Sequence, residues 1–158
     1  MKRRVLLATV LSVLTQPLAG ALPGVTARFG VLTSAGDGAP AFVETTQVPN
    51  VPGQAYGWIA QIDANAKPVS WSEELTLPSA AHRWDGTQGR ADVAVSSTGT
   101  AAITRGTISP GETEFHHFWA VAPGDPSGKY RVVVRVSDGV VAEFAFDVVS
   151  PNERPTRR

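Results

Sequence analysis

The chain of 158 residues carries 14 Lys and Arg against 14 Asp and Glu, with 42% hydrophobic residues and no cysteine. A chain of this length forms one domain that buries about 70% of its unfolded surface, enough for a core without metal or disulfide. The apolar content excludes a disordered protein, and the balanced charge removes the usual argument for a nucleic-acid partner. The absence of cysteine excludes thiolate zinc sites, disulfides and thiol nucleophiles.

The first 21 residues have the layout of a secretory signal peptide. Basic residues at 2–4 precede an apolar run at 5–14, and small residues follow at 19–21. The run is about 10 residues long, whereas a membrane-spanning helix needs about 20, so we predict cleavage after Ala21 and no remaining membrane span. Because an exported domain without disulfides suits a bacterial periplasm, we expect a periplasmic or secreted bacterial protein.

Residues 22–149 read as one all-β domain. Short runs rich in Val, Thr and aromatic residues alternate with Gly, Pro, Asn and Asp, and no apolar stripe at helical spacing exceeds two turns. This spacing is typical of a β-sandwich or barrel. The basic tail at 150–158 has no apolar residues to bury, and we expect it to be disordered. The predicted strands are 26–33, 42–48, 55–63, 69–77, 91–96, 100–108, 113–121, 130–137 and 140–149.

The last two strands also predict their own register. Even-numbered residues are apolar in both, over 130–136 and over 142–148. Directly paired residues point to the same side of a sheet, so the sum of paired numbers must be even. This predicts a three-residue loop at 137–139 with Gly139 in the left-handed conformation. The expected pairs are Val136 with Val140, Val134 with Ala142 and Val132 with Phe144.

The three histidines, His82, His116 and His117, are candidate metal ligands. Neighbours in a strand point to opposite faces, so His116 and His117 cannot both bind one metal unless the strand is bulged. His117 shares the apolar face of its strand, and we expect a core or rim histidine with one hydrogen bond. A copper or zinc site would need His82 to converge with one of this pair and with Glu114 or Asp85. We therefore predict no metal and no cofactor.

No catalytic motif is present: the chain lacks a Gly-x-Ser-x-Gly elbow, a His-Glu-x-x-His sequence and a phosphate-binding glycine loop. Glu73 and Glu74 are the only paired carboxylates, and adjacency on a strand places them on opposite faces, with one toward solvent. A glycosidase needs two carboxylates that face each other. We predict that the protein is not an enzyme, since an enzyme would need a pocket where histidine and carboxylate converge.

Three of the four tryptophans are expected in the core, because Trp58, Trp71 and Trp119 alternate with apolar residues in their strands. Trp84 lies in 78–90, the longest stretch without a strand pattern, at a length where loops are functional or disordered. It is either a plug folded onto the core or an exposed contact residue. The contact site that we predict comprises His82, Arg83, Trp84 and Asp85.

Several short sequence motifs follow one another along the chain. They are Phe29-Gly30-Val31, the segment 44–49 leading into Tyr56-Gly57-Trp58, and a closing hairpin with Gly128-Lys129-Tyr130 and the strand 142–148. In this order the chain resembles, over 28–149, a family of short exported bacterial domains of unknown function. The resemblance implies an immunoglobulin-like antiparallel β-sandwich of about eight or nine strands, and it supplies no catalytic residue.

These observations favour an exported, non-catalytic β-sandwich module that binds another protein or macromolecule of the cell envelope, and not nucleic acid. The alternative is a small-ligand module, for carbohydrate before metal, suggested by the tryptophans and histidines. Two coplanar exposed aromatic rings, or convergence of His82 with His117, would favour that alternative.

Overall fold

The computed structural model describes residues 24–34, 38–81, 83–84, 90–137 and 139–151. The predicted signal peptide and residues 152–158 of the predicted tail lie outside this part. Within it, no helix is long and apolar enough to cross a bilayer. The strands are β1 (Thr26–Ser34), β2 (Pro40–Glu44), β3 (Gln47–Pro49), β4 (Ala55–Gln61), β5 (Val69–Thr76), β6 (Val93–Val95), β7 (Ala101–Ile108), β8 (Glu114–Ala120), β9 (Gly128–Val136) and β10 (Gly139–Val149).

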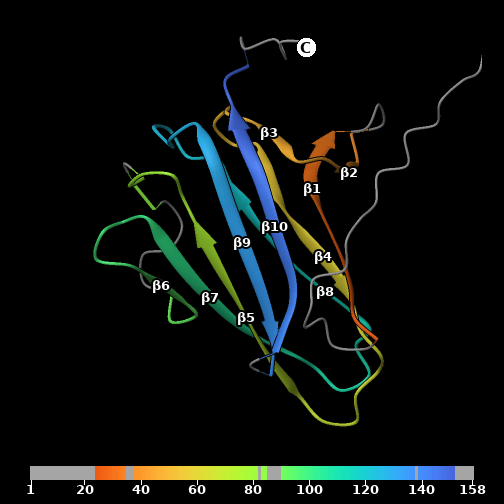
Figure 1. Cartoon of the computed structure of the whole chain (residues 1–158). Coiled ribbons are helices and arrows are strands. Elements are labelled where there is room, and N and C mark those ends of the chain that lie inside the picture. Colours follow the sequence, from red (N-terminus) through yellow and green to blue (C-terminus); the bar gives the residue numbers. More distant parts are fainter. Residues whose placement is uncertain (1–23, 35–37, 82, 85–89, 138, 152–158) are drawn as a thin grey trace, which may run out of the picture.

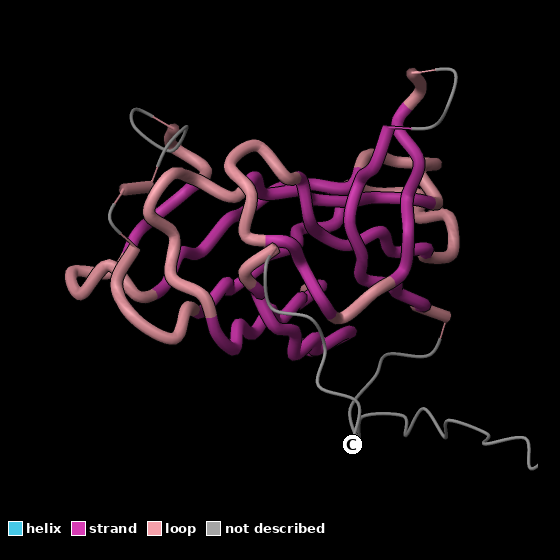
Figure 2. Tube along the Cα trace, turned by 90° about the horizontal axis from the view of Figure 1, so that it is seen from above, coloured by secondary structure: helices cyan, strands magenta, loops and turns pink. Residues whose placement is uncertain are grey.

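The strands form two sheets that face each other as two layers (Figures 1 and 2). One sheet has four strands in the order β2-β1-β4-β8, and the other has six in the order β3-β10-β9-β5-β7-β6. All neighbouring strands run antiparallel except β3 and β10, which are parallel. The predicted all-β sandwich is confirmed.

Each predicted strand overlaps one observed strand, except that the run at 42–48 overlaps two, β2 and β3. The chain leaves the four-stranded sheet after β2 and enters the other sheet as β3. Between them, the Thr45 hydroxyl accepts a hydrogen bond from the Gln47 N–H at 3.0 Å, and the Thr46 carbonyl accepts one from the Asp147 N–H at 2.8 Å. The step from sheet to sheet is therefore held by hydrogen bonds to both threonines.

The register of the β9–β10 hairpin is confirmed over its length and wrong at its turn. Val134 pairs with Ala142 and Val132 with Phe144, as predicted, but Val136 pairs with Gly139 and not with Val140. A bulge between Val140 and Ala142 inserts one residue into β10 and restores the even register. The left-handed residue is Ser137, with φ 46°, and not Gly139. Asp138 lies outside the described residues.

The core lies between the sheets and is built from the alternate side chains that face inward. Phe29 of β1 stacks on Phe146 of β10 with ring centroids 4.3 Å apart, and Trp58 of β4 meets Trp71 of β5 edge to face at 5.4 Å. Trp58 is fully buried, while Trp71 and Trp119 are partly buried against this core. The three tryptophans expected in the core are thus all found there.

Two glycines let the strands of the four-stranded sheet approach closely. Gly30 and Gly57 are paired neighbours on β1 and β4. A Cβ built on either would lie 2.1 Å from a backbone carbonyl oxygen of the adjoining strand, closer than real Cβ atoms approach. On the outer face, Phe42 and Phe118 meet across these glycines with ring centroids 6.2 Å apart. This row of the sheet has no room for larger residues.

Candidate functional site

Glu73 is a fully buried acid in the middle of the core. On β5 it occupies the inward row together with Val69, Trp71 and Leu75, and its exposed fraction is 0%. Glu74 lies on the opposite face, where its carboxylate is 3.5 Å from the Arg135 guanidinium. The prediction that the two carboxylates point to opposite faces, one of them toward solvent, is confirmed.

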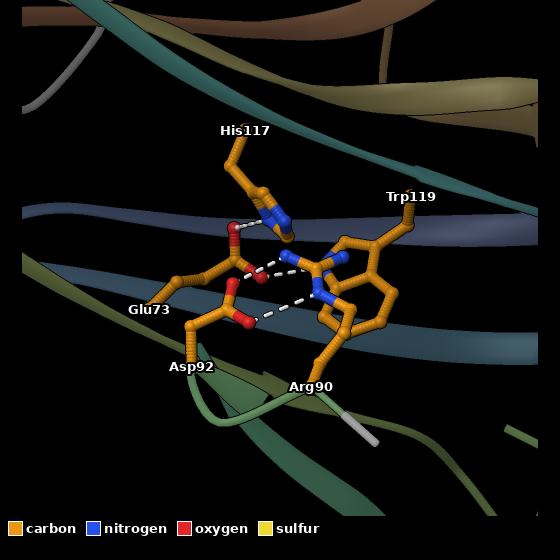
Figure 3. Close-up of polar contacts among 5 residues, drawn as sticks. All are labelled: Glu73, Arg90, Asp92, His117 and Trp119. Atoms are coloured by element: carbon orange, nitrogen blue, oxygen red, sulfur yellow. Dashed lines mark hydrogen bonds and ion pairs between the residues drawn. The ribbon is translucent and has the colours of Figure 1, made fainter. Parts of the chain in front are cut away.

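Three donors from the opposite sheet satisfy the Glu73 carboxylate. The indole N–H of Trp58 on β4 donates to Oε2, and the indole N–H of Trp119 on β8 donates to Oε1. His117 Nδ1 lies 3.0 Å from Oε2, so the imidazole tautomer with its hydrogen on Nδ1 completes the set. Figure 3 shows the carboxylate together with the His117 and Trp119 side chains. We call these four residues the Glu73 cluster.

The Glu73 cluster joins the two layers of the sandwich. Its acceptor comes from the six-stranded sheet and all its donors come from the four-stranded sheet. A buried charge is tolerated only where it is paired and hydrogen-bonded, and here both oxygens are occupied. Because the carboxylate is saturated by the protein's own side chains, this geometry favours a structural link over acid–base chemistry on a substrate.

The histidine pair divides as predicted. His117 points inward with a side-chain exposure of 13%, and its Nδ1 is hydrogen-bonded to Glu73. His116 lies on the outer face and is exposed. Figure 3 also shows an ion pair between Arg90 and Asp92, which lies at the surface. The hydrogen bond from Arg90 is the main cause of the lowered pKa of Asp92.

One buried hydroxyl adjoins the cluster. Thr104 of β7 pairs with Glu73 across the sheet, and its Oγ1 is buried without a hydrogen-bond partner among the described residues. No three histidine, aspartate or glutamate side chains in the described part gather as a metal site. His82, which a metal site would have needed, and Asp85, one of the two candidate carboxylates, lie outside that part.

The predicted contact site is described at two of its four residues. Arg83 is exposed and Trp84 is half-buried. The Trp84 indole N–H donates to the Gly99 carbonyl at 3.1 Å, and its ring meets Trp119 edge to face with centroids 5.8 Å apart. Trp84 thus combines both readings that the sequence left open, since it is packed against the core and is still partly exposed.

A cleft opens beside Trp84. Its space is about 310 Å³ including the open mouth, but the part that a water molecule can enter is only about 20 Å³. The Trp84 and Trp119 rings meet at 71°, so they do not form the flat pair expected of a sugar platform. The cleft is lined by Tyr56, Leu75, Leu77, Ala81, Arg83, Trp84, Trp119, Ala120, Ala122 and Asp125.

Alkaline pH should destabilise the domain through Tyr56, at the base of this cleft. Burial, with the nearby Tyr130 second, raises the pKa of its phenol well above the usual value. The unfolded chain loses this proton near pH 10 while the folded chain keeps it, so the free energy of unfolding falls as pH rises above about 10, by about 1.4 kcal/mol per pH unit. The free energy of unfolding is measured by denaturant unfolding at several pH values above 10. Its decrease per pH unit should be smaller by this amount in Tyr56→Phe than in the wild type. Equal slopes in the two proteins would contradict this prediction.

Sequence reasoning did not identify Glu73 as a core residue, although a signal was present. Glu73 shares the alternating inward row of Val69, Trp71 and Leu75, so its burial follows from the period of two. Its three partners lie 15, 44 and 46 residues away in the chain. No local pattern could have pointed to them.

Comparison with known proteins gives one family and a fold. The profile of the PM0630 beta sandwich domain family matches residues 27–149. A crystal structure of an immunoglobulin-like protein from Pseudomonas aeruginosa is similar, with TM-score 0.50 and 18% identity over 82% of this chain and 100% of that one. An alkylpurine DNA glycosylase from Pseudomonas fluorescens, bound to DNA, gives TM-score 0.37 and 12% identity over 80% of this chain and 31% of that one.

No curated protein matches the chain. The family profile covers the sandwich from β1 to the end of β10, and the first of the two structures shows the same fold. The chain therefore belongs to the PM0630 beta sandwich domain family and has an immunoglobulin-like β-sandwich fold.

Proposed function

We propose that this protein is a non-catalytic binding module of the bacterial cell envelope, which holds a protein or other macromolecular partner at the cleft beside Trp84. The observation that carries the proposal is the half-exposed Trp84 ring, fixed by its hydrogen bond to Gly99 and by Trp119. Tryptophan and arginine are the residues that most often dominate binding energy at interfaces, and the exposed Arg83 adjoins the ring.

The shape of the cleft favours a macromolecule over an enclosed small ligand. Small-molecule sites are typically about 300–1,000 Å³ and surround most of the ligand. Here only about 20 Å³ admits water, so a partner would contact the outer edge of Trp84 and the apolar rim from outside. Export is supported by the basic and apolar pattern of the first 21 residues, and the non-catalytic character by the saturated carboxylate of Glu73.

Site-specific photo-crosslinking in the source bacterium tests this proposal. A photoreactive amino acid at position 83 should give one defined adduct from the envelope fraction. The same amino acid at Lys129, an exposed residue on the outer face of the six-stranded sheet, serves as the matched control and should not give it. Trp84→Ala should abolish the adduct from position 83, and Trp84→Phe, which keeps an aromatic ring but loses the bond to Gly99, should reduce it.

An adduct that forms equally from positions 83 and 129, or that survives Trp84→Ala in a folded protein, would overturn the proposal. So would the absence of any adduct from an exported protein. In a parallel thermal unfolding assay, a midpoint increase with a cell-envelope sugar that saturates and is lost in Trp84→Ala would replace the macromolecular partner by a small ligand.

A further inference from the structure

The outer face of the six-stranded sheet carries a row in which a serine lies between two arginines. Ser72 of β5 pairs with Arg135 of β9 on one side and with Arg105 of β7 on the other. Directly paired residues project to the same face of a sheet, so these three side chains share the solvent side. This row is separate from the cleft beside Trp84, whose lining faces the other sheet.

The neighbouring row on the same face adds hydroxyl groups. Ser70 pairs with Thr107 of β7, and its carbonyl accepts the Ser137 N–H at 3.0 Å. A cleft of about 380 Å³, open mouth included, lies where the two rows meet. It is lined by Ser70, Trp71, Ser72, Arg105 and Ser137.

Among the described residues of this face, Arg105 is the cation whose charge is not balanced by a carboxylate. The other cations of the face are paired: Lys129 with Asp147 at 3.0 Å, Arg131 with Glu143 at 2.6 Å and Arg135 with Glu74 at 3.5 Å. Across the described residues, no ion pair joins the Arg105 guanidinium to a carboxylate. Its backbone N–H bonds to the Asp92 carbonyl at 2.9 Å, while the Asp92 carboxylate is itself held by Arg90.

The hydroxyl groups of the cleft are also available. In the described part of the chain, the side chains of Ser70, Ser72 and Ser137 form no intramolecular hydrogen bond. Each hydroxyl can donate one hydrogen bond, and a guanidinium presents five N–H groups in a planar fork that fits two oxygens of one anion. The donors that line the cleft therefore come from two strands, β5 and β7, and from the turn after β9.

We propose that this cleft binds a tetrahedral oxyanion, a phosphate or sulfate group, through the Arg105 guanidinium and the hydroxyls of Ser70, Ser72 and Ser137. Arg135 lies on the far side of Ser72 and is paired with Glu74, so Arg105 supplies the charge. The anion is small and carries two negative charges. It can therefore neutralise the charge of Arg105 and accept hydrogen bonds from the serine hydroxyls at the same place. The site does not depend on the partner proposed at Trp84.

Nuclear magnetic resonance titration of the labelled protein tests the site. Sodium phosphate and sodium sulfate are added in turn, with sodium chloride adjusted to keep the ionic strength constant. The Arg105 side-chain Nε–H and the backbone amides of Ser70, Ser72 and Ser137 should shift together and saturate. Methyl phosphate and methyl sulfate then distinguish a free ion from the esterified group of a larger molecule, because a site that takes esters binds them as well as the inorganic ions.

Two variants identify the donor. Arg105→Gln should weaken binding at least about tenfold, since a hydrogen bond to a charged group is lost at an exposed and tolerant position. Lys129→Gln removes the same charge from the same face away from the cleft and should change the affinity less than about twofold. Equal weakening in both variants would mean diffuse attraction only and would overturn the site. Shifts that do not saturate, or that chloride alone reproduces, would overturn it as well.

Discussion

Replacing Glu73 with alanine is expected to lower the free energy of unfolding by about 3–5 kcal/mol. The change leaves two indole N–H groups and His117 without an acceptor inside the core, and each unsatisfied buried donor costs about 1–3 kcal/mol. It also opens a cavity at a fully buried position. Denaturant unfolding at neutral pH measures the difference.

Two further variants separate the effect of the Glu73 charge from the effect of its buried position. Glu73→Gln keeps the shape and one acceptor oxygen but places an NH₂ group against donors, so the loss should fall between those of the wild type and Glu73→Ala. Glu74→Gln, one residue along the strand and on the solvent face, should cost less than about 1 kcal/mol. If Glu73→Ala proves as stable as Glu74→Gln, the Glu73 cluster does not hold the layers together.

The second large effect is expected at Gly57. Its Cβ in Gly57→Ala would lie 2.1 Å from the His117 carbonyl oxygen and 2.8 Å from the Phe118 Cα, both backbone atoms of β8. Neither can move without breaking the β4–β8 ladder, so the free energy of unfolding should fall by about 3 kcal/mol or more.

Gly111 provides the matched control for this substitution. It has φ +83°, and an added Cβ meets nothing within 4 Å, so only the conformational cost of about 1–2 kcal/mol applies to Gly111→Ala. Equal losses at Gly57 and Gly111 would show that the strands separate to admit a methyl group. A larger loss at Gly111 would contradict the steric argument altogether.

Much of the fold could be predicted, because burial between two sheets enforces a period of two that the sequence displays directly. The same rule predicted the β9–β10 pairing over most of its length. It did not predict how parity is restored near the turn, since a bulge in β10 and a three-residue loop satisfy the alternation equally well. The change of sheet between β2 and β3 was also missed, because no Gly or Pro within 42–48 marks a break in the run.

The candidate site was less predictable, since its residues meet across the two layers. The inward direction of His117 followed from its strand, but its bond to Glu73 depends on how β5 and β8 face each other. The position of Trp84 depends on the carbonyl of Gly99, in a turn 15 residues further along the chain, and no sequence pattern links the two. His82 and Asp85 remain predictions.

The parallel pairing of β3 with β10 limits the order in which the strands can pair during folding. Val48 pairs with Val148, one hundred residues later, and β4 and β5 also find partners in the second half of the chain. Only the hairpins β1–β2, β6–β7 and β9–β10 are local. Such a high contact order places folding in the millisecond-to-second range. Folding that begins at the N-terminus therefore leaves β3 without its partner strand until β10 is available, so this edge of the six-stranded sheet can be completed only with the last strand of the chain.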